Sequence, residues 1–245
     1  MEKMQVEVRL FASLKDRAGQ ERVSVSLAEP ATVATLTEAL GDAFPQLAPA
    51  LPTVLVAVNH DFAFSDTPLH RGDEVAIFPP VSGGSAQGEA PHPTYFAILE
   101  EEPDVRAITA HLTRPDIGAI VFFHGTVRGE TQRANMPAQT LYLEYEAYEA
   151  MARRKMAQIA TEIWQRWPEV RGVAIVQRVG KLAVGETTTF VACAAGHRDQ
   201  GVFAATRYGI DRLKEIVPIW KKEVGSDHSI WVEGDYTPTA SDQHE

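Results

Sequence analysis

Cationic side chains are concentrated in one stretch of an otherwise acidic chain. His197 and Arg198 lie where an apolar, strand-like run gives way to a helical pattern, and Lys214 and Lys221 follow. Backbone N–H groups at a helix N-terminus, with a guanidinium beside them, form a suitable anion site. A lysine among apolar residues and other cations has a lowered pKa and is suited to acid, base or nucleophilic chemistry. The stretch therefore predicts an anion pocket served by lysines.

Each of these residues also has a plain structural interpretation. His197 and Arg198 can be surface loop residues that pair with a neighbouring acid. Lys214 shares its helical spacing with Arg207 and Asp211, which is typical of a solvated ladder of ion pairs. The local sequence leaves both interpretations open.

A second chemical feature is the segment Pro79-Pro80-Val81-Ser82-Gly83-Gly84. Because Gly83 and Gly84 have no side chains, they can pass through a narrow channel and bring a backbone carbonyl to a remote site. The plain alternative is a flexible domain end. Ser85 follows, so the carbonyl of Gly84 belongs to a peptide bond and is not a free carboxylate.

Composition narrows the class of protein. A net charge of −10 over 245 residues argues against an extended nucleic-acid-binding surface. Cys193 is the one cysteine, which excludes an internal disulfide and a cysteine-rich metal cluster, and its apolar neighbours indicate a buried, inert side chain. No apolar run approaches the ~20 residues that span a bilayer, and the N-terminus lacks a signal-peptide core. We expect a soluble, cytoplasmic protein without a metal site.

The segment 85–93 contains no large apolar residue and predicts a flexible linker between domains at 1–84 and 94–245. In the first domain we predict a hairpin turning at Gly19-Gln20, a helix with Thr32 as its N-cap, and two further strands. Their ranges are strands 5–11 and 22–27, helix 32–44, and strands 54–58 and 74–78. The order ββαββ predicts a β-grasp, ubiquitin-like fold.

The second domain is predicted to be α+β, with a mixed sheet and two principal helices. A buried strand at 118–128 leads into a polar loop at 129–140. The remaining elements are a strand at 141–145, a helix at 146–167, strands at 173–180 and 187–195, and a helix at 200–216 that Pro218 ends.

Several motifs resemble the two subunits of molybdopterin synthase. Residues 1–84 are similar to the small subunit through Leu10-Phe11-Ala12, Val58-Asn59, Gly72-Asp73-Glu74-Val75 and the Gly-Gly segment. Residues from about 94 to 235 resemble the large subunit through Phe123-His124-Gly125-Thr126-Val127-Arg128, Ala195-Gly196-His197-Arg198, Asp211-Arg212-Leu213-Lys214 and Pro218-Ile219-Trp220-Lys221-Lys222-Glu223.

The resemblance implies a sulfurtransferase of molybdenum cofactor biosynthesis. Its substrate is cyclic pyranopterin monophosphate. The sulfur comes from a carrier protein whose final glycine bears a thiocarboxylate, and an adenylating enzyme loads the sulfur onto that carrier. By matched position, Lys221 and Lys214 are catalytic, and His197 and Arg198 bind the substrate anion. Arg128 is expected to reach the partner's site in a homodimer formed by the second domain. The resemblance implies no cofactor or metal.

The fusion departs from the family, which has two separate chains. Adenylation and thiolation of Gly84 require its bond to Ser85 to be cut; otherwise the first domain is a passive partner of separate carrier chains. Two further alternatives are a ubiquitin-like protein modifier, and a non-catalytic binding module whose tail fills the lysine pocket.

Overall fold

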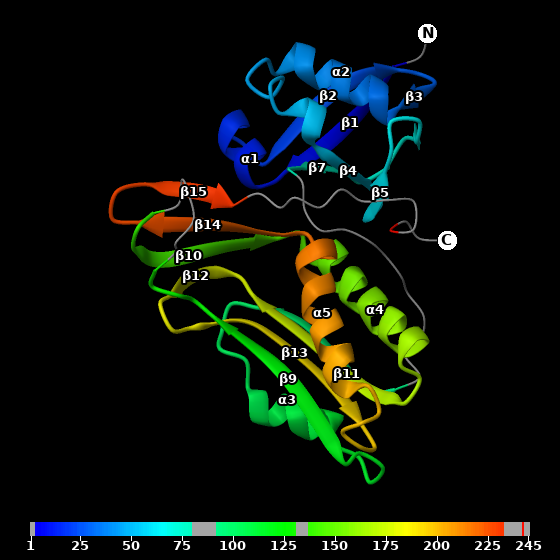
Figure 1. Cartoon of the computed structure of the whole chain (residues 1–245). Coiled ribbons are helices and arrows are strands. Elements are labelled where there is room, and N and C mark those ends of the chain that lie inside the picture. Colours follow the sequence, from blue (N-terminus) through cyan, green and yellow to red (C-terminus); the bar gives the residue numbers. More distant parts are fainter. Residues whose placement is uncertain (1–2, 80–91, 131–136, 233–241, 243–245) are drawn as a thin grey trace. The chain divides into compact units, whose positions relative to one another are not determined.

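The computed structural model describes residues 3–79, 92–130, 137–232 and Asp242, and the chain divides into two compact units (Figure 1). Residues 3–79 belong to the first unit, and the described residues from 92 to 232 belong to the second. Gly83, Gly84 and most of the predicted linker at 85–93 lie outside the described residues. The domain boundaries therefore stay predictions.

The first unit contains short helices and strands in the order β1 (Lys3–Leu10), α1 (Ala12–Ala18), β2 (Arg22–Ala28), β3 (Ala31–Thr32), α2 (Val33–Ala43), η1 (Leu51–Thr53), β4 (Leu55–Val58), β5 (Asp61–Ala63), β6 (Pro68–Leu69) and β7 (Val75–Phe78). Its five-stranded sheet has the order β2-β1-β7-β4-β5. The central pair, β1 and β7, is parallel, and the other neighbours are antiparallel.

Alternation along β1 and β2 builds the core of this unit. Every second side chain of these strands is buried, among them Val8 and Val23, which lie opposite each other. Leu36 and Leu40 of α2 are buried in the same core. Thr32 caps α2 as predicted, because its side chain accepts a hydrogen bond from the Thr35 amide. The predicted β-grasp fold is thus confirmed.

The predicted hairpin is confirmed in its pairing, because β1 and β2 are antiparallel neighbours, but their connection is more than a turn at Gly19-Gln20. Helix α1 lies between the paired strands β1 and β2, and Gly19 ends it in the left-handed conformation with φ of 70°. The amide of Gly19 donates to the carbonyl of Lys15, which is a common way to close a helix. With only seven residues, α1 is shorter than the window over which helical periodicity is recognisable.

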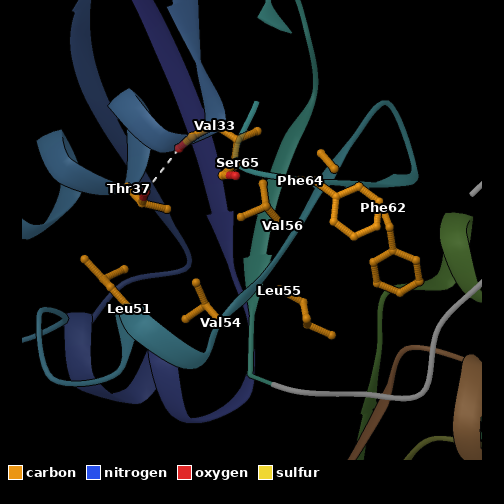
Figure 2. A pocket seen from close by; sticks show the side chains of 10 residues that line it. Val33, Thr37, Leu51, Val54, Leu55, Val56, Phe62, Phe64 and Ser65 are labelled. Atoms are coloured by element: carbon orange, nitrogen blue, oxygen red, sulfur yellow. Dashed lines mark hydrogen bonds between the residues drawn. The ribbon is translucent and has the colours of Figure 1, made fainter. Parts of the chain in front are cut away.

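An apolar pocket of about 240 Å³ opens on this unit beside α2, η1, β4 and β5 (Figure 2). Val33, Leu51, Val54, Val56 and Phe62 are among the residues that line it. None of the predicted site residues lines this pocket, so the lysine chemistry must be sought in the second unit.

The second unit contains β8 (Thr94–Leu99), α3 (Val105–Leu112), β9 (Ala119–Thr126), β10 (Thr140–Ala147), α4 (Glu149–Arg166), β11 (Val170–Arg178), β12 (Gly180–Ala183), β13 (Thr187–Ala195), α5 (Val202–Ile216), β14 (Ile219–Gly225) and β15 (Ser229–Val232). One four-stranded sheet has the order β8-β11-β13-β9, and another has the order β12-β10-β14-β15. The β8–β11 pair is parallel, so the first of these sheets is mixed as predicted.

Strand β13 is buried on both faces, which explains its nearly continuous apolar sequence. On one face, Phe190 packs in a cluster with Ile108 and Leu112 of α3. On the other face lies α5, where Gly209 brings the helix backbone close to Val191. Figure 1 shows α4 and α5 side by side along this sheet. Helix α5 therefore runs along β13, and each end of the helix lies near one end of the strand.

The prediction that residues 118–128 form a buried strand is wrong in one respect. Strand β9 forms there, but it is the edge of its sheet, and Phe122 and Phe123 are 48% and 39% exposed. Phe203, on the first turn of α5, is 63% exposed. An apolar run of this length is equally typical of a central strand and of an edge strand with an apolar surface. None of the described helices has the length and apolar character that spanning a bilayer requires.

Candidate functional site

Lys214 occupies the last turn of α5 and directs its ammonium group toward the sheet. Its Nζ donates to Oγ1 of Thr189 at 3.2 Å and to Oε1 of Gln177 at 3.4 Å. Although Lys214 as a residue is exposed, both acceptor side chains are buried, so its aliphatic stem meets solvent while the charged end is enclosed. Burial, followed by the charge of Lys221, lowers the pKa of Lys214 to about 8.

Lys221 lies on β14, opposite Tyr145 of β10 and Val232 of β15. Its effect on the pKa of Lys214 places the two ammonium groups near each other. Two lysines that repel each other favour a state in which one is neutral and the other is charged. Such a pair is able to accept a proton at one nitrogen and donate one from the other.

Three consecutive threonines at the start of β13 each meet a different partner. Thr187 donates to Glu102, Thr188 hydrogen-bonds Tyr145, and Thr189 donates to Oε1 of Gln177 at 2.7 Å. The register of β13 against β9 shifts between Thr187 and Thr189. This irregularity breaks the two-residue alternation, as β-bulges beside functional sites commonly do. It lets neighbouring residues serve separate polar clusters.

Thr187 belongs to a polar cluster of its own, next in the chain to the contacts of Lys214. This cluster includes His124, whose Nε2 is 2.7 Å from Oγ1 of Thr187. Arg178 is buried and pairs with Glu102 at 2.6 Å. Arg128 lies near the same end of β13. Gly125 of β9 is opposite Thr189, and the amide of Val127 donates to the carbonyl of Glu186, just before β13. The exposed Arg128 is therefore at the lysine end of its own chain.

His197 and Arg198 form an exposed cluster in front of the first turn of α5. Nη1 of Arg198 donates to Nε2 of His197 at 2.9 Å, and Nδ1 of His197 donates to Asp199 at 2.6 Å. The hydrogen bond from His197 lowers the pKa of the Asp199 carboxyl. The chain of contacts fixes the imidazole between a guanidinium and a carboxylate.

The structure does not bring all predicted site residues together within one chain. Arg198 precedes the first residue of α5, Val202, and Lys214 lies in the last turn, which is about 18 Å from Val202 along the helix axis at 1.5 Å per residue. Lys214, Lys221 and Arg128 share one end, and His197 and Arg198 share the other. Gly83 and Gly84 lie outside the described residues.

Gln177 and Thr189 are polar contacts of Lys214 that were not predicted from the sequence. Their signal was the change from the apolar run of β11 to Gln177-Arg178, and the threonines ahead of the apolar run of β13. A fully buried glutamine at the end of an apolar strand needs a polar partner, and here that partner is at the lysine. Among the described residues, no three of the His, Cys, Asp and Glu side chains are grouped in a way that would hold a metal ion.

Comparison with known proteins gives the two units separate relatives. The family model described as MoaE protein matches residues 98–216, and that of the ThiS family matches residues 8–84. The molybdopterin synthase catalytic subunit of Halalkalibacterium halodurans is 45% identical over 146 residues, which are 60% of this chain and 89% of that protein. That of Bacillus subtilis is 39% identical over 146 residues, covering 60% and 88%.

A solved structure agrees with these sequences. The crystal structure of molybdopterin synthase from Staphylococcus aureus matches with a TM-score of 0.52 and 39% identity, over 57% of this chain and 97% of that one. The chain belongs to the family of molybdopterin synthase catalytic subunits, and it carries a ThiS-family domain ahead of the catalytic one.

Proposed function

We propose that this protein is a molybdopterin synthase that combines sulfur carrier and catalyst in one gene product. It transfers two sulfur atoms, one from each of two Gly84 thiocarboxylates, to cyclic pyranopterin monophosphate and so builds the dithiolene of molybdopterin. The observation that carries this proposal is the enclosed ammonium of Lys214, whose pKa is lowered to about 8 beside Lys221.

The lysines supply the proton transfers that the reaction needs. The thiocarboxylate sulfur forms a bond to a substrate carbon, and the oxygen on that carbon leaves after it receives a proton from an ammonium group. Water then attacks the acyl carbon of the carrier, which releases the Gly84 carboxylate and leaves the sulfur on the substrate. A charged lysine stabilises the anionic adduct in each step, and a neutral one removes the proton of the attacking water.

His197 and Arg198 hold the substrate anion, and in this proposal they come from a second copy of the chain. Their distance from Lys214 along α5 supports this arrangement, because one pocket within one chain would have to bridge the whole helix. Phe122 and Phe123 on the edge strand β9 and Phe203 on α5 are large apolar side chains left exposed in the single chain, which supports a protein contact along this edge. This arrangement differs from the one that the family resemblance implies, in which Arg128 crosses, and that expectation stays a prediction.

Sulfur transfer by this chain requires cleavage after Gly84, because an amide carbonyl cannot be converted to a thiocarboxylate. Residues 1–84 and 85–245, produced separately and supplied with the loading enzyme, should form molybdopterin. The Ser85→Pro chain, whose scissile bond is protected from most proteases, should not form it. Intact mass spectrometry should find a fragment ending at Gly84 in the native host, with the mass increase of sulfur for oxygen. Equal sulfur transfer by an intact Ser85→Pro chain as the sole carrier would contradict the proposal.

A further inference from the structure

Lys214 meets only neutral oxygens in the described hydrogen bonds of its ammonium group. The two acceptors are the amide oxygen of Gln177, on β11, and the hydroxyl oxygen of Thr189, on β13. The charged group that acts on it is Lys221 of β14, which repels it. This is unusual, because a buried or enclosed lysine is normally paired with a carboxylate.

The orientation of the Gln177 amide is fixed by its other contact. Its Nε2 donates to the carbonyl of Arg178 at 2.9 Å, so Oε1 faces Thr189 and Lys214. The reverse orientation would turn an amide N–H group toward the ammonium and lose all three hydrogen bonds. Because Gln177 is fully buried, the packing around it allows little freedom to rotate.

Thr189 completes a closed triangle of hydrogen bonds. Its hydroxyl donates to Gln177 at 2.7 Å and thereby turns its lone pairs toward Lys214. The hydroxyl proton is used, so Thr189 acts toward the lysine only as an acceptor. The two side chains together form a rigid neutral cradle for one nitrogen.

We propose that Gln177, oriented by Thr189, is a positioning residue for Lys214. Its amide oxygen holds the ammonium group at the site, and because the amide is neutral it does not stabilise the protonated form as a carboxylate would. This inference rests on the proposed function for the importance of Lys214 in sulfur transfer, but the cradle itself is testable without turnover. A carboxylate at position 177 would occupy nearly the same volume and accept the same two hydrogen bonds, from Thr189 and Lys214, although it would lose the bond that the amide donates to the Arg178 carbonyl. It would also add a negative charge next to the ammonium, which an amide does not.

The test measures the proton affinity of Lys214 directly. The full-length protein is treated with acetic anhydride across a range of pH, and acetylation of Lys214 is quantified by peptide mass spectrometry, because only the neutral amine reacts. We expect a midpoint near pH 8 for the native chain. In Gln177→Glu the midpoint should rise by about 1–3 units, as for an ion pair at this range. In Thr189→Val it should fall, because an acceptor that favours the charged form is lost.

The opposite signs separate positioning from general disruption of the fold. Gln165→Glu, which adds the same charge at an exposed position of α4, is the matched control and should leave the midpoint unchanged. An unchanged midpoint in Gln177→Glu, or shifts of the same sign in Gln177→Glu and Thr189→Val, would overturn the inference. If the midpoints move as expected while single-turnover sulfur transfer follows neither of them, the cradle stands and the proposed role of Lys214 fails.

Discussion

At the scale of single residues, the site depends on which groups surround a lysine more than on the lysine itself. Lys181 illustrates the contrast, because its Nζ lies 3.9 Å from the centre of the Tyr142 ring on an exposed part of β12. Lys214 instead meets two buried neutral oxygens and a second ammonium. A general acid or base works best when its pKa is near the working pH, and the surroundings of Lys214 lower its pKa to about 8.

Lys221→Ala should abolish sulfur transfer, and Lys214→Ala should reduce it severely, while the fold stays intact. Losing a proton-transfer group typically costs ~10²–10⁴-fold in rate. The measurement is a single-turnover assay with preformed thiocarboxylate, which removes the loading and cleavage steps from the result. Lys181→Ala is the control and should retain normal rates. Near-normal turnover by Lys221→Ala would remove this residue from the mechanism.

At the scale of elements, helix α5 sets where the functional groups lie, and its seat on β13 depends on Gly209. A Cβ at this position would lie 2.9 Å from Cγ1 of Val191 and 3.5 Å from Cδ1 of Ile163, both in fully buried residues. Gly41 lies in the last turn of α2, and its nearest neighbour is Cδ1 of the half-buried Leu51 at 3.3 Å. Close packing against buried side chains therefore requires a glycine at position 209, whereas the packing around Gly41 can adjust to a methyl group.

Gly209→Ala should lower the melting temperature of the second unit, and Gly41→Ala should leave that of the first unit equal or higher. Alanine gains about 1 kcal/mol of helix propensity over glycine at either position. At Gly209 an overpacking penalty of about 1–3 kcal/mol opposes this gain. Calorimetry of both variants tests the difference. A stabilised Gly209→Ala chain would mean that α5 is free to move away from β13.

The sequence predicted the elements that have a clear period and missed those that depend on tertiary contacts. Strand β13 was predicted at its observed bounds, and Met151, Ile159 and Ile163 face inward from α4 as expected. Strand β14, which carries Lys221, was missed, because its mixture of lysines and apolar residues has no two-residue alternation. Its pairing with β10 and β15 stabilises it instead. The cradle of Lys214 was missed for the same reason: Gln177 and Lys214 meet only after folding.

At the scale of the whole molecule, the positions of the charged groups predict which pairs of defective chains restore each other. Co-expressed Lys221→Ala and Arg198→Ala chains should recover about a quarter of wild-type activity, since half the dimers are mixed and each of those has one intact site of two. Lys221→Ala with Arg128→Ala should recover nothing, because both residues lie at the same end of their own chain. The assay is molybdopterin formation by the unseparated mixture of dimers that co-expression gives. The reverse pattern would mean that Arg128 crosses and that His197 and Arg198 do not.

The length of α5 between its two charged ends has a kinetic consequence. If a single chain holds half of each pocket, a newly made chain has no activity until it meets another. At concentrations well below the dissociation constant of the pair, the rate of product formation should rise with the square of the chain concentration. Dilution then becomes a reversible way to switch the enzyme off, and a cell that makes few copies would have far less activity per chain than one that makes many.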